Sequence, residues 1–181
     1  METSRGEVEA RLNVQSSISA EFRRIFDSEF GYVCRGLRRL GVRDSDMKDV
    51  AQELFMTVLG QVGRYDPQRP LRPWLFSFAV RFAANYRRLA RNHGHDGGRE
   101  GPPVPSQHAD LEARDLVLRA LARIDFDRRV AVVMHDMEGF AAPEIATELG
   151  VPLNTVYSRI RLGRADLRTT VAELQGTATP S

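Results

Sequence analysis

The chain has 181 residues, of which 42% are apolar and 28% are charged, an ordinary balance for a folded globular protein. Its longest apolar runs are far shorter than the roughly 18–20 residues needed to cross a membrane, and its N-terminal residues contain no apolar signal segment. We therefore expect a cytoplasmic protein without membrane insertion. The single cysteine, Cys34, excludes an internal disulfide.

The formal net charge is only +2, but the charged residues are unevenly placed. Lys48 is the one lysine among 26 basic residues, and arginine presents a planar set of donors that suits phosphates and base edges. Arginines cluster in 81–91 and 159–168, whereas acidic residues gather in 44–53 and 110–115. Local basic runs in a nearly neutral chain favour a nucleic-acid surface. Either run alone fits an ordinary solvated helix face as well as it fits a nucleic-acid surface.

A segment rich in glycine, proline and polar residues, 92–109, divides the chain. Its composition predicts a flexible linker. Apolar residues recur with helical spacing on both sides of it, and no alternating run predicts a strand. The fold class is therefore expected to be all-α. Two small helical domains, 15–91 and 110–175, are expected to move independently in the unbound protein.

The first domain is expected to contain three main helices. An apolar stripe over 22–40 predicts the first, which Gly41 ends. Short acceptor side chains at 44–46 are expected to cap the next helix. Three prolines in 64–73 predict a loop, and a long helix is expected to follow over 74–91.

The second domain is expected to contain four helices. Residues 111–124 form the first, and Asp127 is expected to cap a second helix that Gly139 ends. A short helix over 143–149 and a last helix over 154–174 complete the domain.

The segment 142–165 has the features of a helix-turn-helix. Ala146 is small enough for two helices to cross closely, and Gly150 tolerates the positive φ of a tight turn. Helical spacing predicts a buried face of the last helix formed by Leu153, Val156, Ile160, Gly163 and Leu167. The outer face and its flanks would enter the major groove of DNA; they comprise Asn154, Thr155, Tyr157, Ser158, Arg159, Arg161, Leu162, Arg164 and Ala165. A hairpin used only for packing would not need this arginine-rich face.

Three segments, in this order, resemble motifs of the extracytoplasmic-function (ECF) group of the bacterial sigma-70 family. DVAQELF (49–55) resembles a signature of region 2, RPWLFSFAVRFAANYRRLARN (72–92) resembles the tryptophan-containing stretch that follows it, and EIATELGVPLNTVYSRIRLGRA (144–165) resembles region 4. The resemblance covers about 22–167. It implies an RNA polymerase sigma factor that directs transcription initiation, with no catalytic activity, cofactor or metal, and with an anti-sigma factor as a partner.

The resemblance also implies three binding sites. Core RNA polymerase would be bound through the clamp helices of its largest subunit by Asp49, Gln52, Glu53 and Phe55, and through the flap of its second-largest subunit. The minus-10 promoter element would be read by the loop 65–73 and the helix after it, through Arg69, Arg72, Arg81, Asn85 and Arg88. The minus-35 element would be read by the outer residues of the last helix named above, from Asn154 to Arg164. Arg81, Tyr157 and Leu162 depart from the family pattern, so we expect unusual base preferences.

Two alternatives stay open. A stand-alone helix-turn-helix regulator would explain 144–168 but not the two earlier segments. A sigma-like decoy, which holds a partner without initiating transcription, fits the departures from the family pattern. An enzyme is not expected, because the sequence has no glycine-rich phosphate loop and no nucleophile–base motif. His93 and His95 lack a third metal ligand nearby.

Overall fold

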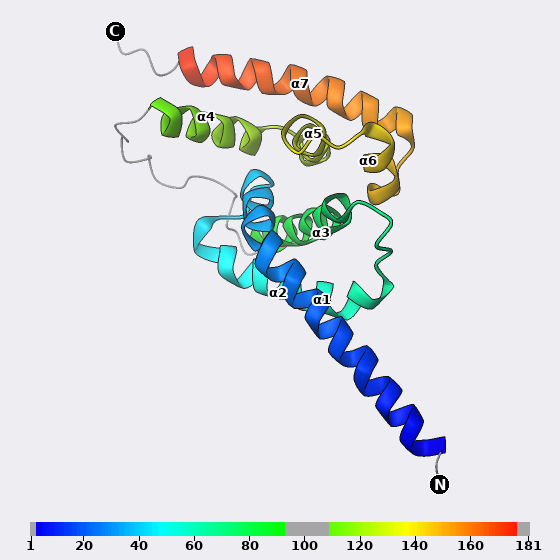
Figure 1. Ribbon diagram of the computed structural model, residues 1–181. Helices are drawn as coiled ribbons and strands as arrows, with labels where there is room; N and C mark the ends of the chain where they lie inside the picture. The colour runs from blue at the N-terminus through cyan, green and yellow to red at the C-terminus, as the bar shows by residue number, and fades with distance from the viewer. Residues whose placement is uncertain (1–2, 93–108, 177–181) are drawn as a thin grey trace.

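The computed structural model describes the backbone of residues 3–92 and 109–176, and the side chains of 19–91 and 112–176. Every regular element in these ranges is helical (Figure 1), which confirms the all-α prediction. None of these helices is both long enough and apolar enough to span a membrane. The predicted linker, 92–109, falls almost wholly outside the described residues, so its flexibility stays a prediction.

The first half of the chain is built from three α-helices and two short 3-10 turns. In order these are α1 (Thr3–Arg39), η1 (Asp44–Asp46), α2 (Met47–Gln61), η2 (Val62–Arg64) and α3 (Leu71–Asn92). The first helix begins well before the predicted domain boundary at residue 15, and its N-terminal part extends away from the body (Figure 1). The three helices pack around fully buried residues such as Leu37, Leu54 and Leu75.

Two local predictions in this half were wrong. Helix α3 begins at Leu71, earlier than predicted, because Pro73 falls in the first turn, where a backbone N–H has no helical partner. Asp46 does not cap α2 with its side chain; the carboxylate instead accepts a hydrogen bond from Tyr86. Gly41 follows the end of α1 as predicted, with a φ of +99°.

The second half is also helical, and its last helix lies across the others. It contains α4 (Ala109–Arg123), α5 (Phe126–Val132), the π-helical turn η3 (Val133–Met137), α6 (Ala142–Leu149) and α7 (Leu153–Gly176). Figure 1 shows α7 running along α4 and α5 to the turn after α6, and it packs against all three of these helices.

The helix-turn-helix is present, with two corrections of detail. Asp125, rather than Asp127, caps α5; its side chain accepts a hydrogen bond at 3.1 Å from the backbone N–H three residues later. Leu153, expected in the buried face of α7, is 38% exposed because it stands at the first position of the helix. Gly150 has the predicted left-handed conformation, with a φ of +65°.

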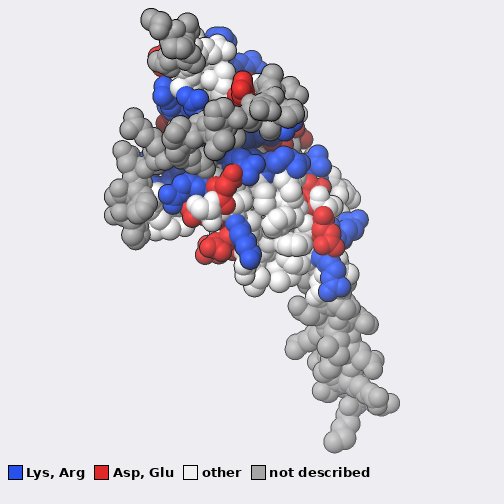
Figure 2. All heavy atoms as spheres, turned by 90° about the vertical axis from the view of Figure 1, so that its left-hand side faces the viewer, with Lys and Arg blue, Asp and Glu red and all other residues white. Residues whose placement is uncertain are grey.

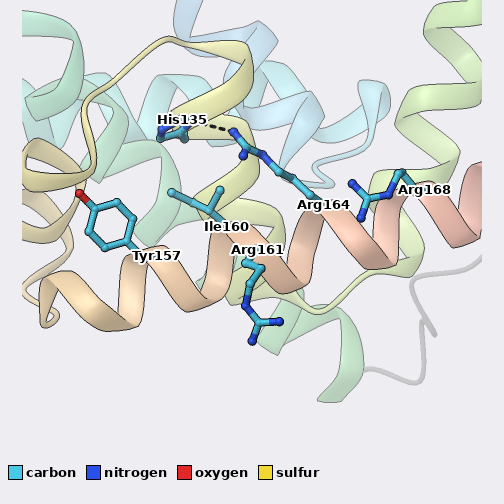
Figure 3. Close-up of a pocket in the computed structure, with 6 residues that line it drawn as sticks. All are labelled: His135, Tyr157, Ile160, Arg161, Arg164 and Arg168. Carbon is cyan, nitrogen blue, oxygen red and sulfur yellow. Dashed lines mark hydrogen bonds between the residues drawn. The ribbon is translucent and has the colours of Figure 1, made fainter.

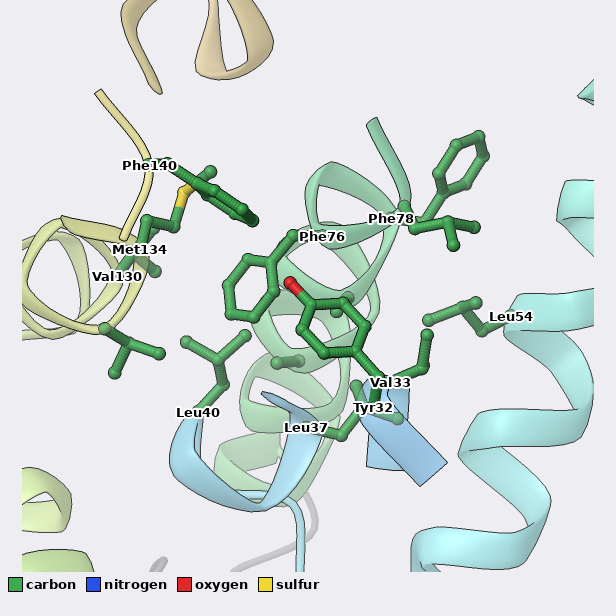
Figure 4. Close-up of a cluster of buried hydrophobic side chains, with 14 of the residues drawn as sticks. Tyr32, Val33, Leu37, Leu40, Leu54, Phe76, Phe78, Val130, Met134 and Phe140 are labelled. Carbon is green, nitrogen blue, oxygen red and sulfur yellow. The ribbon is translucent and has the colours of Figure 1, made fainter. Parts of the chain in front are cut away.

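The two halves pack against one another. The ring of Phe76 in α3 lies edge-on to that of Phe140, with 6.0 Å between centroids. Figure 4 shows Phe76 between Leu40 of the first half and Met134 of the second. These three side chains and that of Phe140 are buried. The described residues therefore share one apolar core, in contrast to the independently moving domains expected from the composition of the connecting segment.

Helices α5 and α7 approach most closely at Gly163. A Cβ atom at this position would lie 2.7 Å from a methyl carbon of Val132 and 2.9 Å from the carbonyl oxygen of Arg128. The missing side chain thus allows direct contact between the two helices. This contact helps to set the direction in which α7 leaves the turn.

Replacing Gly163 with alanine is expected to lower the free energy of unfolding by about 1–3 kcal/mol, because the new methyl group overlaps backbone atoms of α5. Gly60→Ala is the matched control, since open space surrounds Gly60 in α2 and alanine favours a helix by roughly 1 kcal/mol. Thermal unfolding followed by circular dichroism should give a lower Tm for the first variant only. Equal Tm values for Gly163→Ala and the wild type would contradict this close approach.

Candidate nucleic-acid and protein interfaces

Helix α2 carries three of the predicted polymerase-binding residues on one exposed face. These residues line a shallow surface groove, here named the acidic groove, which is formed by Asp49, Gln52, Glu53, Met56, Thr57 and Phe82. Met56 is 63% exposed, so the groove offers an apolar contact beside two carboxylates. A partner helix that carries arginines and a small apolar patch would match this surface, because carboxylate–guanidinium bonds are directional.

Phe55, the fourth residue predicted for this site, does not reach the groove. It is 2% exposed, and its ring lies 4.9 Å from that of Phe26 and 5.7 Å from that of Phe30. The side chain supports α2 from inside instead of facing a partner. Met56 takes the exposed apolar position, and its spacing of four residues from Gln52 was the sequence signal that could have placed it there.

The residues predicted to read a single DNA strand lie on the loop before α3 and on the outer face of that helix. All of them are exposed: Arg69, Arg72, Arg81, Asn85 and Arg88. Trp74 connects loop and helix, because its ring lies 4.8 Å from Tyr65 and 4.9 Å from Phe78. These contacts give Trp74 a packing role within the first half.

Two arginines of the loop are already paired with carboxylates. Arg72 donates a hydrogen bond to Glu29 at 3.1 Å, and Arg69 forms an ion pair with Glu148 of α6. The second pair joins the two halves of the chain. In both pairs a carboxylate occupies a guanidinium that the sequence predicts to contact DNA.

The arginines on the outer face of α3 are held by neutral groups. Arg81 donates to the backbone oxygen of Ser77 at 3.2 Å, and its guanidinium carbon lies 4.4 Å from the centre of the Phe78 ring. Arg88 donates to the amide oxygen of Asn85 at 2.8 Å. Since arginine only donates hydrogen bonds, Arg81 can present donors, but no acceptor, to a base.

Helix α7 separates buried from exposed residues largely as predicted. Val156 and Ile160 face the core. The exposed predicted residues are Asn154, Tyr157, Ser158, Arg161 and Arg164, and the half-buried ones are Thr155, Arg159 and Leu162. The exposed set lies along one face of the helix.

A second surface groove, here named the arginine groove, runs beside this face. It is lined by His135, Tyr157, Ile160, Arg161, Arg164 and Arg168 (Figure 3). In Figure 3, Arg161 points away from the helices packed behind α7, whereas Arg164 turns back toward His135. Within the described residues, no carboxylate pairs with Arg161 or Arg168. These two arginines are therefore available to an external anion.

The other two arginines of this helix are neutralised by the preceding elements. Arg164 donates through Nε to one oxygen of Asp136 at 2.8 Å and through a second nitrogen to the other oxygen. Arg159 pairs with Asp127. Sequence reasoning missed Asp136, because it lies 28 residues before its partner and no helical period connects the π turn to α7.

Basic and acidic side chains are intermixed over the wider surface. On the face shown in Figure 2, lysine and arginine side chains gather near the level at which the two halves meet, with acidic side chains among them. This face therefore carries a local basic band mixed with acidic side chains, consistent with a formal net charge of +2.

Hydrogen bonds from Arg164 hold the pKa of the Asp136 carboxyl below its usual range, and His135 contributes in the same direction. We expect Arg164→Ala to raise this pKa toward the ordinary value of about 3.9. A ¹³C NMR titration of the side-chain carboxyl would measure the change, and Arg161→Ala is the control because Arg161 points away from His135 and from the helices behind α7.

The same pair affects stability in acid. A carboxyl with a depressed folded-state pKa stabilises the fold above its unfolded-state pKa, and this contribution is lost as the pH falls through the folded-state value. Arg164→Ala should therefore weaken the dependence of unfolding on pH in this acidic range. An Asp136 titration identical in the wild type and in Arg164→Ala would contradict the paired geometry.

Two family models match the two halves of the chain. Sigma-70 region 2 matches residues 25–93, and sigma-70 region 4 matches residues 114–167. The first match contains the acidic groove and α3, and the second contains the helix-turn-helix. Their order along the chain is the one that the three sequence segments predicted.

Several curated proteins are similar over most of their length. The ECF RNA polymerase sigma factor SigM of Mycobacterium tuberculosis is 32% identical over 132 residues, which are 72% of this chain and 67% of that protein. The RNA polymerase sigma factor CnrH of Cupriavidus metallidurans is 30% identical over 150 residues, 75% of this chain and 78% of that protein. SigL of Mycobacterium tuberculosis is 29% identical over 167 residues, 86% of this chain and 92% of that protein.

Two solved structures have a similar fold. CnrH in complex with the cytosolic domain of CnrY aligns with a TM-score of 0.66 and 22% identity, over 93% of this chain and 96% of that one. The sigma factor RpoE in complex with the anti-sigma factor NepR from Bartonella quintana aligns with a TM-score of 0.69 and 20% identity, over 84% of this chain and 97% of that one.

Both region models match in order, and relatives at 30% identity or more align over two thirds or more of their length. The chain therefore belongs to the ECF group of the sigma-70 family, whose members are RNA polymerase sigma factors and not enzymes.

Proposed function

We propose that the chain binds core RNA polymerase through the acidic groove and promoter DNA through two arginine-bearing faces, and so directs transcription initiation. The observation that carries this proposal is the presence of all three surfaces on one chain: the groove on α2, the loop and outer face of α3, and the outer face of α7. A stand-alone helix-turn-helix regulator would need only the last of these surfaces.

Polymerase docking would use the exposed carboxylates of α2. Asp49 and Glu53 would pair with arginines of the clamp helices in the largest subunit, and Met56 would pack beside them. The second half would meet the flap of the second-largest subunit. Since charge pairs across an interface fix its register as well as its strength, the two carboxylates would act together.

Reversing the charge at both positions, Asp49→Arg with Glu53→Arg, is expected to weaken core binding by about a hundredfold or more. Thermal unfolding should change little, because both side chains are exposed. Asp27→Arg with Glu112→Arg is the control, since it reverses two exposed charges on other helices. Copurification with core polymerase gives the measurement, and a groove variant that binds like the wild type would remove the basis for this docking site.

The minus-10 element would be bound as a single strand along α3. Arginines would cradle the phosphates, and a base turned out of the stack would meet the outer face near Arg81 and Asn85. Arg69 and Arg72 must first leave Glu148 and Glu29, because each guanidinium is occupied by its carboxylate in the free chain. Strand binding would therefore compete with these intramolecular pairs.

The minus-35 element would be read in the major groove by α7. Asn154 and Ser158 stand near the N-terminal end of the helix, where a recognition helix approaches base edges. Arg161 points outward from the middle of that face. The usual basic residues are missing at Tyr157 and Leu162, so Arg161 would carry more of the base reading.

Replacing Arg161 with alanine is expected to cost about 1–3 kcal/mol at the preferred minus-35 sequence and to flatten the preference at one or two base pairs. Arg168→Ala should instead weaken binding about equally on all sequences and reduce the salt slope by roughly 0.9, as expected for one phosphate contact. Selection from a promoter library with each variant would compare them. If Arg161→Ala kept the full sequence preference, α7 would have to lie in the groove at another rotation.

Control by an anti-sigma factor, and action in the cytoplasm, belong to the same proposal. The support is that both structurally similar sigma factors were solved with a bound partner, the cytosolic domain of CnrY and the anti-sigma factor NepR. Run-off transcription with core polymerase and selected promoters tests the whole function. Core binding without any promoter-directed transcript would favour the decoy alternative over an initiation factor.

A further inference from the structure

One wall of the arginine groove does not belong to α7. It is formed by η3, whose π-helical turn is closed by a hydrogen bond at 3.0 Å from the backbone N–H of Glu138 to the carbonyl oxygen of Val133, five residues earlier. Turns of this kind are rare and occur frequently at functional sites. The turn contributes His135 to the groove, where Arg164 points toward it (Figure 3).

A carboxylate fixes the tautomer of His135. Its Nδ1 lies 2.7 Å from Oδ1 of Asp136, and two unprotonated acceptors would repel each other at that distance. Nδ1 therefore carries a hydrogen and donates a hydrogen bond to the carboxylate. The same oxygen accepts a second hydrogen bond, at 2.5 Å, from Arg164. The three side chains form one network, here named the groove triad.

The groove triad leaves Nε2 as the ring atom that can meet an external group. The side chain of His135 is 34% exposed, and both of its hydrogen-bond contacts within the described residues involve Nδ1. In the neutral ring Nε2 is an acceptor, which would repel an anion. In the protonated ring Nε2 is a donor on a cation. Only the protonated form of His135 can therefore bind an anion through this atom.

The groove attracts anions from its other wall. Arg161 and Arg168 stand about two helical turns apart on α7, and no carboxylate pairs with either of them among the described side chains. Asp136 offsets only the charge of Arg164. Phosphate oxygens suit such a site, because guanidinium groups donate charge-assisted hydrogen bonds to them.

The other charged side chains near η3 are engaged elsewhere. Helices α5 and α6 pack against η3, but their carboxylates and Arg128 have partners of their own, as does Glu138 at the end of the turn. These pairs are Asp127 with Arg159, Arg128 with Asp166, Glu138 with Arg39, Glu144 with the backbone N–H of Ala141, and Glu148 with Arg69.

The remaining cation of α5, Arg129, is directed toward the first half of the chain. It is 2% exposed and donates to the backbone oxygen of Leu40 at 3.1 Å. Gly41 leaves room for it, because a Cβ atom there would lie 2.6 Å from a terminal nitrogen of Arg129. The groups that face His135 are therefore Asp136 and the groove side chains of α7.

The position of the groove identifies the anion that it would meet. A recognition helix in the major groove presents its outer residues to base edges, and phosphates of the two backbones lie at its flanks. Arg161 points outward, whereas Arg164 turns toward η3 (Figure 3). The arginine groove thus lies on one flank of the outer face of α7. A phosphate of the DNA backbone would occupy this flank.

We propose that His135, in its protonated form, is a further DNA-binding residue that contacts a backbone phosphate in the arginine groove. The placement of DNA along α7 rests on the proposed function. Binding then takes up a proton, so affinity for DNA is high below the range in which histidine side chains titrate, near pH 6.5, and falls as the pH rises through it. Asp136 stays charged in this range, because Arg164 holds the pKa of its carboxyl below the usual value.

The test compares three full-length proteins: the wild type, His135→Gln and His135→Arg. Glutamine is neutral at every pH, and arginine is positive at every pH. Fluorescence anisotropy would measure binding to a labelled DNA duplex between about pH 8 and about pH 5.5, which brackets the ordinary histidine value. The buffer contains neither phosphate nor sulfate. At about 0.1 M salt we expect wild-type affinity to rise roughly eightfold, because one phosphate contact changes log K by about 0.9 for each tenfold change in salt.

The two variants should bracket the wild type. His135→Gln is expected to keep the weaker affinity across the range, and His135→Arg the stronger one. The salt slope should steepen by roughly 0.9 at low pH in the wild type only. His93, His95 and His108 titrate in the same range, and their contribution is common to all three proteins. A His135 that only supported the fold would lower the Tm of both variants and would not move their affinities in opposite directions.

A duplex with one neutral methylphosphonate at a time locates the contact. At one position the neutral linkage should remove the pH dependence of wild-type binding and leave His135→Gln unaffected. If no single linkage did so, a DNA phosphate would be excluded as the occupant of the groove. Equal pH dependence in the wild type and in His135→Gln would also overturn the proposal.

The proposed function is tested separately with two duplexes, one carrying the selected minus-35 sequence and one of random sequence. A phosphate contact acts on both. Equal affinity for the two duplexes, with the order of the three proteins preserved, would contradict minus-35 recognition while supporting the role of His135. Sequence-selective binding with the same pH dependence in all three proteins would do the reverse.

Discussion

Helix α3 is buried on two sides, and the rest of the structure depends on this constraint. Residues 75–79 are buried at every position, whereas a surface helix buries a single stripe. Figure 4 shows Phe76 on the side of α5 and Phe78 on the side of α2. Separating the halves would expose Phe76 and Phe140, at about 1.5–3 kcal/mol for each. The helix proposed to bind the minus-10 strand is therefore also the joint of the molecule.

The arginines on the proposed DNA-binding faces differ in whether a carboxylate pairs with them. Arg69, Arg159 and Arg164 are paired with carboxylates of other elements, which limits their rotamers and offsets their positive charge locally. Arg161 and Arg168 have no carboxylate partner among the described side chains and can reorient. On the faces proposed to bind DNA, the unpaired arginines can contact phosphates directly, whereas the paired ones must first leave their carboxylates.

Helical spacing was sufficient to predict the all-α class, the two halves and most of the exposed face of α7, because these features depend on neighbours within one or two turns. The errors involve partners distant in sequence or exact helix ends. The sequence predicts Asp127 as a cap of α5, whereas Asp125, two residues away, is the cap in the structure. Phe55 fits either the core or a polymerase contact from its sequence alone, and Phe26 and Phe30 cover it in the structure.

The contacts between the halves could not be predicted from spacing at all. Arg129 reaches a carbonyl 89 residues earlier in the chain, and its target is a backbone oxygen with no side-chain signature. From the sequence alone, Glu138 and Glu148 are expected to be solvated acids. In the structure they pair with arginines 99 and 79 residues away. The composition of 92–109 predicts independent motion of the two halves. It could not predict the contacts between them, because a connecting segment carries no information about the surfaces that it joins.

The pairing of Gly41 with Arg129 has an evolutionary consequence. The two residues lie in different matched regions, 25–93 and 114–167, yet a side chain at position 41 would displace the guanidinium. Selection on either residue therefore depends on the other. A relative with a larger residue at position 41 is therefore expected to lack the buried arginine as well. Covariation between these two positions across related genomes would then show which relatives preserve this contact between the halves.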